Sequence, residues 1–282
     1  MATLPARGVL VVATDLQGNL GDYHALLRVL EAERAAGQDA WLVLCGDMVH
    51  GPSCELTVPG AWPEHLGTYY EDRSAELVLD LIDLVERTDT ICLIGNHEHA
   101  HVGGPVVSKF HEDEAATLEA RLGPECERVR RFLRGLPLVA VAPCGVVCTH
   151  GAPRATERDL DAFETLEYER TREGIAFERI PLWRMTEAGT VGALLWARGA
   201  APEHARALLE ATSLDGEPNA FVVYGHDIVR SGFERVGDEQ ICVSTSFGLY
   251  DRDKTYLRLD LAARYRSAAD LRVGHEILPL YP

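Results

Sequence analysis

Long hydrophobic runs are missing from this sequence of 282 residues. Near the N-terminus, the apolar stretch 9–13 is followed closely by Asp15 and is too short for the core of a signal peptide or for a membrane span. We therefore predict a cytoplasmic protein with no membrane partner.

Positive charge is scarce as well. The chain has 27 Lys and Arg residues against 44 Asp and Glu residues, which gives a formal net charge of −17. Nucleic acids and anionic membranes attract proteins through a positive field, and this chain is strongly acidic. We therefore expect no bulk nucleic acid among its partners.

Paired cysteine motifs are absent. The seven cysteines are odd in number, show no CxxC spacing and mostly lie inside apolar runs. This pattern is typical of buried free thiols in a reducing compartment, in agreement with a cytoplasmic location.

No repeat, low-complexity tract or linker divides the chain. Hydrophobic residues make up 46% of the sequence and charged residues 25%, which is the balance of an ordinary globular protein. We predict one domain over residues 1–282, with helical insertions at about 106–134 and 155–190, where Glu and Arg are frequent.

Strands and helices alternate in the first half of the chain. Apolar runs at 8–14, 41–45 and 90–94 are separated by segments whose apolar spacing predicts helices at 22–36 and 74–87. Such alternation predicts an α/β fold with parallel strands covered by helices on both faces. From residue 138 onward, short apolar runs joined by turns predict a more antiparallel second half.

Potential metal ligands follow five successive apolar strands. In an open sheet, side chains beyond the carboxyl ends of neighbouring strands converge on one crevice, so we expect these residues to meet. Their mixture of oxygen and nitrogen donors fits manganese, iron or zinc better than calcium. The candidate ligands are Asp15 with Gln17, Asp47, Asn96, His150 and His226.

At these positions the sequence resembles the calcineurin-like metallophosphoesterases, and in particular their phosphoprotein phosphatase branch. The family's opening motif corresponds to TDLQGN at 14–19, its GD motif to 46–47 and its GNHE motif to 95–98. Further matches are the segment from LPL at 136–138 to THG at 149–151, LLW at 194–196 and YGH at 224–226. The resemblance implies two packed mixed β-sheets flanked by helices, in a four-layer α/β/β/α sandwich.

The resemblance also implies two divalent metal ions, with manganese, iron and zinc as candidates. Asp47 would bridge the ions, and Asp15 and Gln17 would bind the first one. The second ion would be held by Asn96, His150 and His226.

A general acid and two phosphate-binding residues complete the predicted site. His97 is the candidate acid that protonates the leaving oxygen, because an imidazole exchanges a proton near neutral pH. Arg198 is a candidate catalytic and substrate-binding residue, and Arg154 a candidate substrate-binding residue, since guanidinium groups bind phosphate oxygens in pairs. Each arginine can equally be an ordinary surface residue.

The first ion site departs from the family pattern. Gln17 stands where the family has a histidine ligand, and an amide oxygen is a weaker ligand than imidazole for late first-row metals. We therefore expect the first ion to bind loosely, or to be a harder ion such as manganese or magnesium.

The surroundings of the predicted acid depart as well. His50 stands where the phosphatase branch has a carboxylate that orients the acid, and Gly51 stands where it has an arginine that holds phosphate. Either another group orients His97, with Glu98, His99 and His101 as the nearby candidates, or its role as an acid is diminished.

The preferred function is a metal-dependent phosphoesterase that hydrolyses a phosphorylated small molecule, nucleotide or phosphopeptide. The resemblance implies attack by a hydroxide that bridges the two ions. Gln17 leaves two alternatives open. One is a metal-binding scaffold without turnover, and the other is a non-phosphatase reaction at an altered metal site.

Overall fold

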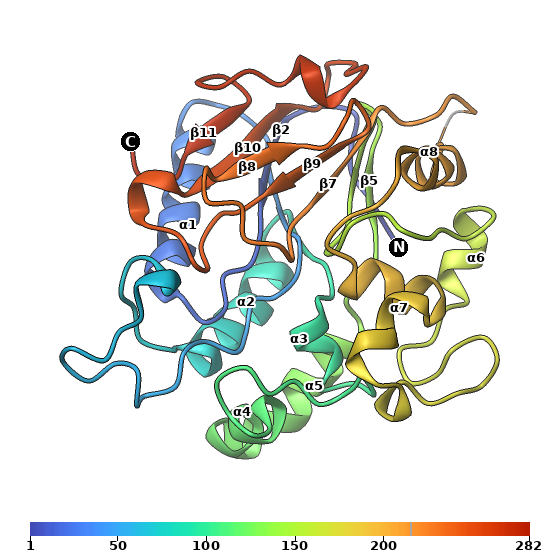
Figure 1. Ribbon diagram of the computed structural model, residues 1–282. Helices are drawn as coiled ribbons and strands as arrows, with labels where there is room; N and C mark the ends of the chain where they lie inside the picture. The colour runs from blue at the N-terminus through green and yellow to red at the C-terminus, as the bar shows by residue number, and fades with distance from the viewer. Residues whose placement is uncertain (215) are drawn as a thin grey trace.

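Two β-sheets packed face to face form the centre of the protein (Figure 1). The structure is a computed structural model that describes residues 1–214 and 216–282. The first sheet has the strand order β11-β10-β2-β3-β4, with bounds Ile277–Pro279, Thr255–Asp260, Val9–Ala13, Ala40–Leu44 and Thr90–Cys92. The second has the order β1-β5-β6-β7-β9-β8, with bounds Ala2–Thr3, Ala140–Ala142, Val146–Cys148, Phe221–Tyr224, Gln240–Val243 and Phe233–Arg235.

Both sheets are mixed, as the family resemblance implied. Strands β2, β3 and β4 run parallel, whereas β10 runs antiparallel to β2 and to β11. In the second sheet β6, β7 and β9 run parallel, and β5 and β8 are antiparallel to their neighbours β6 and β9. The second half is therefore less antiparallel than the sequence predicted, because a long crossover after β6 brings β7 back in the same direction.

Alternate residues of β2 enter two different cores, as the period of two in a strand requires. Leu10 and Val12 pack between the sheets with residues such as Val223. Val9 and Val11 belong to the core that includes the helices. Because both faces of β2 are covered, its sequence is continuously apolar rather than alternating.

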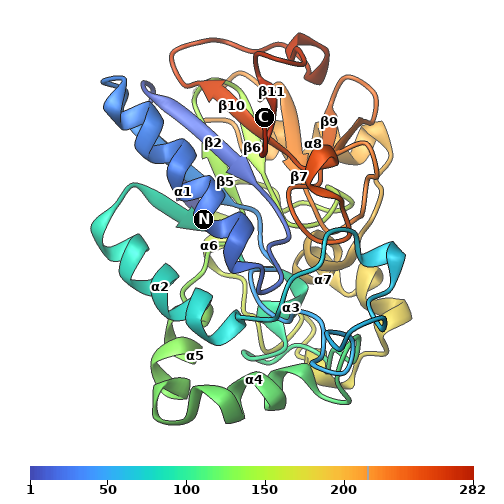
Figure 2. The ribbon, with the colours of Figure 1, turned by 90° about the vertical axis from the view of Figure 1, so that its left-hand side faces the viewer.

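Helices cover the outer faces of the two sheets. Helices α1 and α2 pack against the first sheet, α8 packs against the second, and Figure 2 shows α1 running alongside β2. This confirms the predicted four layers. The helix bounds are α1 Leu20–Ala35, α2 Ser74–Arg87, α3 Asn96–His99, α4 Glu114–Leu122, α5 Cys126–Arg134, α6 Leu160–Glu164, α7 Gly189–Trp196 and α8 Pro202–Ala211.

The two predicted insertions differ in structure. Segment 106–134 contains α4 and α5, whereas segment 155–190 contains the short α6, the 3₁₀ turns Phe177–Arg179 and Leu182–Glu187, and the start of α7. Gly174, with a positive φ of 80°, and Pro181 interrupt the helical pattern there. Their status as insertions into a single domain stays a prediction.

The cysteines are all free. Five of the seven are buried as predicted, whereas Cys54 is exposed and Cys126 is half-buried. None of the helices in the described parts of the chain has the length and apolar character needed to cross a membrane.

A buried ion pair joins the start of α1 to the last strands. The Asp22 carboxylate lies 2.8 Å from Lys254 Nζ, and both side chains are only 2% exposed. The hydroxyls of Ser246 and Tyr281 also donate to this carboxylate, at 2.5 and 2.7 Å. The Asn19 side chain caps the helix by accepting from the Asp22 backbone N–H. This network fixes the loop that contains Asp15 and Gln17.

We predict that Lys254→Met lowers the free energy of unfolding by about 3–5 kcal/mol, because it leaves the Asp22 charge buried without its cation. Urea denaturation of the purified chain measures this change. Arg252→Met is the control, because the exposed Arg252 side chain pairs with its neighbour Asp253 at the surface, so that its loss should cost about 0–1 kcal/mol. Equal losses for the two variants would contradict this account of the ion pair.

Candidate metal centre

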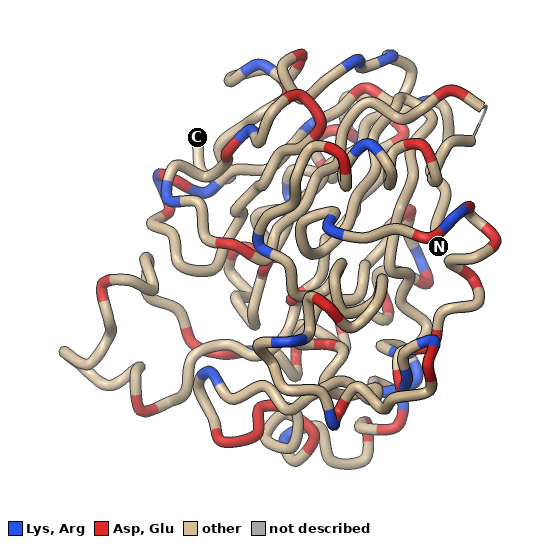
Figure 3. Tube along the Cα trace, turned by 45° about the vertical axis from the view of Figure 1, so that its right-hand side comes forward, with Lys and Arg blue, Asp and Glu red and all other residues tan. Residues whose placement is uncertain are grey.

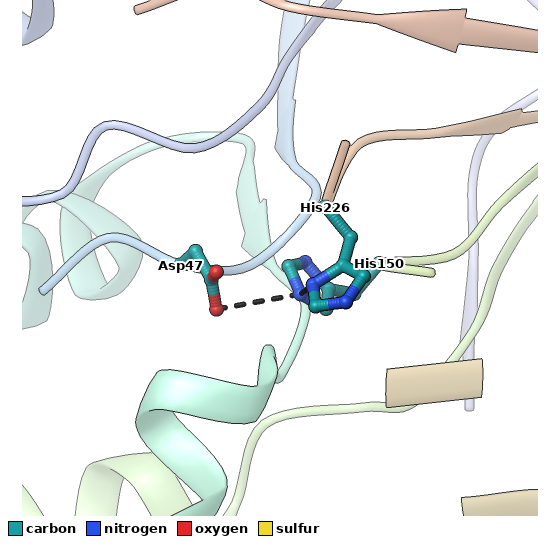
Figure 4. A group of neighbouring side chains, drawn as sticks. All are labelled: Asp47, His150 and His226. Atoms are coloured by element: carbon teal, nitrogen blue, oxygen red, sulfur yellow. Dashed lines mark hydrogen bonds and ion pairs between the residues drawn. The ribbon is translucent and has the colours of Figure 1, made fainter. Parts of the chain in front are cut away.

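The loops that follow β3, β4, β6 and β7 bring four of the predicted ligands together. The His150 Nε2 atom lies 2.9 Å from Asn96 Oδ1, 3.1 Å from His226 Nδ1 and 3.4 Å from Asp47 Oδ1. Figure 4 shows the side chains of Asp47, His150 and His226 pointing toward one another. The convergence that the sequence predicted at the carboxyl edge of the strands is therefore present for these four residues.

The hydrogen bonding of His150 defines the chemistry of this cluster. Its Nδ1 lies 2.8 Å from the Cys45 carbonyl oxygen, which can only accept, so Nδ1 carries the hydrogen and the neutral ring has its lone pair on Nε2. That lone pair faces the oxygens of Asn96 and Asp47, which are also electron-rich. Several lone pairs directed at one point form a site for a cation, and this donor set fits a divalent transition metal.

The charges in the cluster support the same conclusion. Burial would raise the pKa of Asp47, but the nearby histidines, His150 above all, lower it to about 2. Burial would lower the pKa of His150, but the carboxylates of Asp47 and Asp15 raise it. Burial and the charge of His150 hold the pKa of His226 well below its usual range. The carboxylates therefore attract positive charge to this point, and a bound divalent ion, which needs an ionised carboxylate and a neutral imidazole, would supply that charge in place of a proton on His150.

Asp15 lies at the edge of this cluster. Both of its carboxylate oxygens accept from the His226 backbone N–H, at 3.2 and 3.1 Å. Burial raises the pKa of Asp15 to about 7, although the charge of His150 opposes this effect. A cation beside Asp15 would favour its ionised form.

The Gln17 side chain contacts Lys109 rather than the four converging residues. Its backbone N–H donates to the Asp47 carbonyl at 2.9 Å, and its side-chain Oε1 accepts from Lys109 Nζ at 3.1 Å. The amide oxygen predicted to bind the first ion therefore contacts an ammonium group. Nothing in the sequence motifs pointed to Lys109, because it lies in the segment 106–134.

The backbone of these loops is strained. In residues 1–214 and 216–282, five non-glycine residues have positive φ angles, and all belong to the loops of this centre. Such conformations are costly for residues with a Cβ atom and persist where the surrounding structure enforces them, often at functional sites. The five residues are Asp15, Gln17, Asp47, His50 and His226.

The comparisons with known proteins agree with this geometry. The model of the family described as calcineurin-like phosphoesterase matches residues 8–230, which is most of the chain. The chain belongs to the calcineurin-like phosphoesterase family. It is thus a metallophosphoesterase, a phosphatase-like hydrolase, as the resemblance predicted.

Solved structures share the fold of this phosphoesterase at low sequence identity. A protein serine/threonine phosphatase from Saccharomyces cerevisiae, with similarity to human phosphatase PP5, is 14% identical, with a TM-score of 0.58 over 92% of this chain and 76% of that one. A cold-active protein-tyrosine phosphatase of a psychrophilic Shewanella species is 14% identical, with a TM-score of 0.51 over 93% of this chain and 79% of that one. A comparison with proteins of curated function gave no significant match.

His97 of the phosphoesterase is held by residues from two segments. Its Nδ1 lies 2.9 Å from His50 Nδ1 and 3.2 Å from Glu114 Oε2. Glu114 therefore supplies a carboxylate beside His97 where the motif at His50 lacks one. It is only 1% exposed, and although burial alone would raise its pKa, the two histidines lower it. The sequence motifs did not reveal Glu114, because it lies at the start of α4, between the short motifs that carry the resemblance.

A chain of hydrogen bonds continues from His50 through His101 to Glu119. His50 Nε2 lies 2.9 Å from His101 Nε2, and His101 Nδ1 lies 3.0 Å from Glu119 Oε1. A carboxylate can only accept, so His101 carries its hydrogen on Nδ1 and accepts from His50, which in turn accepts from His97. Burial lowers the pKa values of both His50 and His101, the latter to about 4, which agrees with neutral rings. The sequence candidate His101 thus acts on His97 only through His50.

The other two candidates for orienting His97 have different partners. His99 Nε2 donates to the Tyr168 carbonyl at 2.7 Å. Glu98 is fully buried, and its carboxylate accepts from the backbone N–H groups of four residues at 2.8 to 3.2 Å. Those residues are Asp47, Met48, Val49 and Gly95. Glu98 therefore shapes the loop after β3 rather than contacting the imidazole.

The two predicted arginines lie in different surroundings. Arg198 Nη1 donates to the His226 carbonyl at 3.0 Å and to Asp227 Oδ1 at 2.9 Å, which places its half-exposed guanidinium beside the centre. The Arg154 side chain is exposed, and no hydrogen bond or ion pair joins it to the described residues. Its role in substrate binding stays a prediction.

We predict that Glu98→Gln lowers the free energy of unfolding by about 1–3 kcal/mol, because the new amide turns a donor group toward buried N–H donors. Urea denaturation of the metal-free protein measures the loss. Glu76→Gln, on the exposed surface of α2, is the matched control and should change stability little. If both variants unfold at the same urea concentration as the wild type, Glu98 does not hold the loop.

Proposed function

We propose that this phosphoesterase hydrolyses the phosphate ester of a small molecule, nucleotide or phosphopeptide, using a divalent ion held by Asp47, Asn96, His150 and His226. The main support is the convergence of the His150, Asn96 and Asp47 lone pairs on one point. Manganese, iron and zinc fit this mixed donor set. When bound, such an ion polarises the phosphoryl group and lowers the pKa of a water molecule that it binds.

We assign His97 the role of proton donor to the leaving oxygen. Its Nδ1 is engaged by His50 and Glu114, whereas its Nε2 faces the cluster, 3.7 Å from Asp47 Oδ2. The contacts of Nδ1 with His50 and Glu114 fix the orientation of the ring. The ring can therefore present its Nε2 hydrogen to a leaving group beside the metal centre.

Arg198 is the proposed contact for the phosphate. Its guanidinium is tethered to Asp227 and stays half exposed, so its remaining N–H groups can donate to phosphoryl oxygens. Asp and Glu residues occur along the whole chain in Figure 3, in keeping with a discrete phosphorylated group rather than bulk nucleic acid as the substrate. The free cysteines are the basis for proposing a cytoplasmic location.

We predict that Asp47→Asn abolishes hydrolysis of an aryl phosphate, at least about 100-fold, while the fold is retained. The substitution removes the ionised carboxylate of the cluster, so binding of Mn²⁺ by calorimetry should weaken in parallel. Asp238→Asn, at an exposed position, is the control and should leave both properties unchanged. Full activity of Asp47→Asn would exclude this centre as the catalytic one, and a wild type that binds Mn²⁺ without hydrolysing any phosphate ester would favour the scaffold alternative.

We predict that His97→Ala slows alkyl phosphates about 100-fold or more but slows activated aryl phosphates much less, because a good leaving group needs no proton. Steady-state kinetics on a series of esters measures this difference. The exposed His204→Ala is the control. Equal slowing across the whole series would argue against His97 as the proton donor.

A further inference from the structure

Lys109 places an ammonium group beside the metal centre. Its Nζ donates to Gln17 Oε1 at 3.1 Å and lies 3.6 Å from the centre of the Phe247 ring. The chain contains only two lysines, and the other, Lys254, is committed to the buried pair with Asp22. Lys109 is thus one of two lysines in the chain, and its ammonium contacts Gln17 and the Phe247 ring.

Both sides of this contact are anchored. The backbone N–H groups of Lys109 and Phe110 donate to Glu114 Oε1 at 3.0 and 2.6 Å. On the other side, the Phe247 N–H donates to the Asp15 carbonyl at 3.0 Å. Lys109 is an exposed residue, but these two ordered segments and its contact with the Phe247 ring direct its ammonium toward Gln17.

The charges around Lys109 are those that a first metal ion would encounter. Burial lowers the pKa of Lys109 to about 8, but the carboxylates of Asp47 and Asp15 oppose this effect and favour the charged form. These are the same two carboxylates that the resemblance assigned to the first ion. An ammonium at this position supplies positive charge to them without a metal.

We propose that the Lys109 ammonium takes the place of the first metal ion beside Gln17, so that the chain binds a single divalent ion at Asp47, Asn96, His150 and His226. This inference rests on the proposed function, because it takes that ligand set as the metal site. Gln17 has one side-chain oxygen directed into this region, and Lys109 already engages it. A second divalent ion at that point would also be repelled by the ammonium.

Two consequences distinguish this arrangement from a site with two ions. First, the presence of Gln17 in place of the usual histidine is then explained by its partner. The amide oxygen of Gln17 accepts a hydrogen bond from the Lys109 ammonium, whereas a histidine at this position would direct its nitrogen lone pair to a metal ion. Second, Gln17 and Lys109 together occupy the first metal position. Removing the lysine should open the first site, and removing a ligand of the other site should not.

The test is Mn²⁺ binding by the full chain after chelation, with stoichiometry from calorimetry and elemental analysis and with electron paramagnetic resonance as a second readout. We expect the wild type to bind one Mn²⁺ with the spectrum of an isolated ion. Lys109→Met should bind two, with the spectrum of a coupled pair, and Lys109→Gln serves as a second neutral variant if the first does not fold. Arg73→Met, which removes an exposed cation elsewhere, should still bind one.

Two results would overturn the inference. Two coupled Mn²⁺ ions in the wild type would mean that Lys109 does not occupy the first position, and it would then be free to contact the substrate. One ion in both neutral Lys109 variants would mean that the lysine does not exclude a second ion. Failure of the proposed function gives a different pattern, in which the wild type binds no Mn²⁺ or His226→Ala binds it as well as the wild type does.

Discussion

The buried negative charge of Asp47 is the constraint on which this site depends. Its side chain is almost completely buried, yet its pKa lies near 2, so the surroundings must stabilise an anion away from water. The neighbouring histidines, His150 above all, lower that pKa, and the His97 backbone N–H donates to Asp47 Oδ1 at 3.1 Å. Glu98 fixes the backbone of the same loop by accepting from the Asp47 N–H. A Cβ atom on Gly95 would lie 2.3 Å from Asp47 Oδ1, so the glycine of the GNHE segment is required for this close approach.

The segment 106–134 adds a carboxylate and an ammonium group to the site formed by the loops after the strands. Glu114 brings a carboxylate to His97, where His50 has replaced the expected acidic residue. The other oxygen of Glu114 holds the backbone of Lys109, whose ammonium reaches Gln17. Residues of this one segment therefore contact the sites of two departures from the family motifs, those at Gln17 and His50, and a single carboxylate connects the two contacts.

The sequence was a good guide where the residues follow from regular structure. The ends of β3, β4, β6 and β7 could be predicted because apolar runs stop at polar residues, and strands of an open sheet bring such ends to one edge. Glu114 and Lys109 could not be predicted in the same way. Their positions depend on how an irregular loop folds over the sheets, and no local spacing records that. The sequence also favoured a helical segment 155–190, where the structure is mostly irregular.

The pairing of β2 has a consequence for how the protein forms during synthesis. In the pairing of β10 with β2, Leu257 lies opposite Val12, so one edge of this early strand stays open until residues 255–260 have left the ribosome. Closing so long a loop is entropically costly and slows folding. The Asp15 loop, which directly follows β2, therefore gains its final shape late. A nascent chain that ends before β10 exposes an unpaired strand edge, which is the kind of surface that chaperones shield.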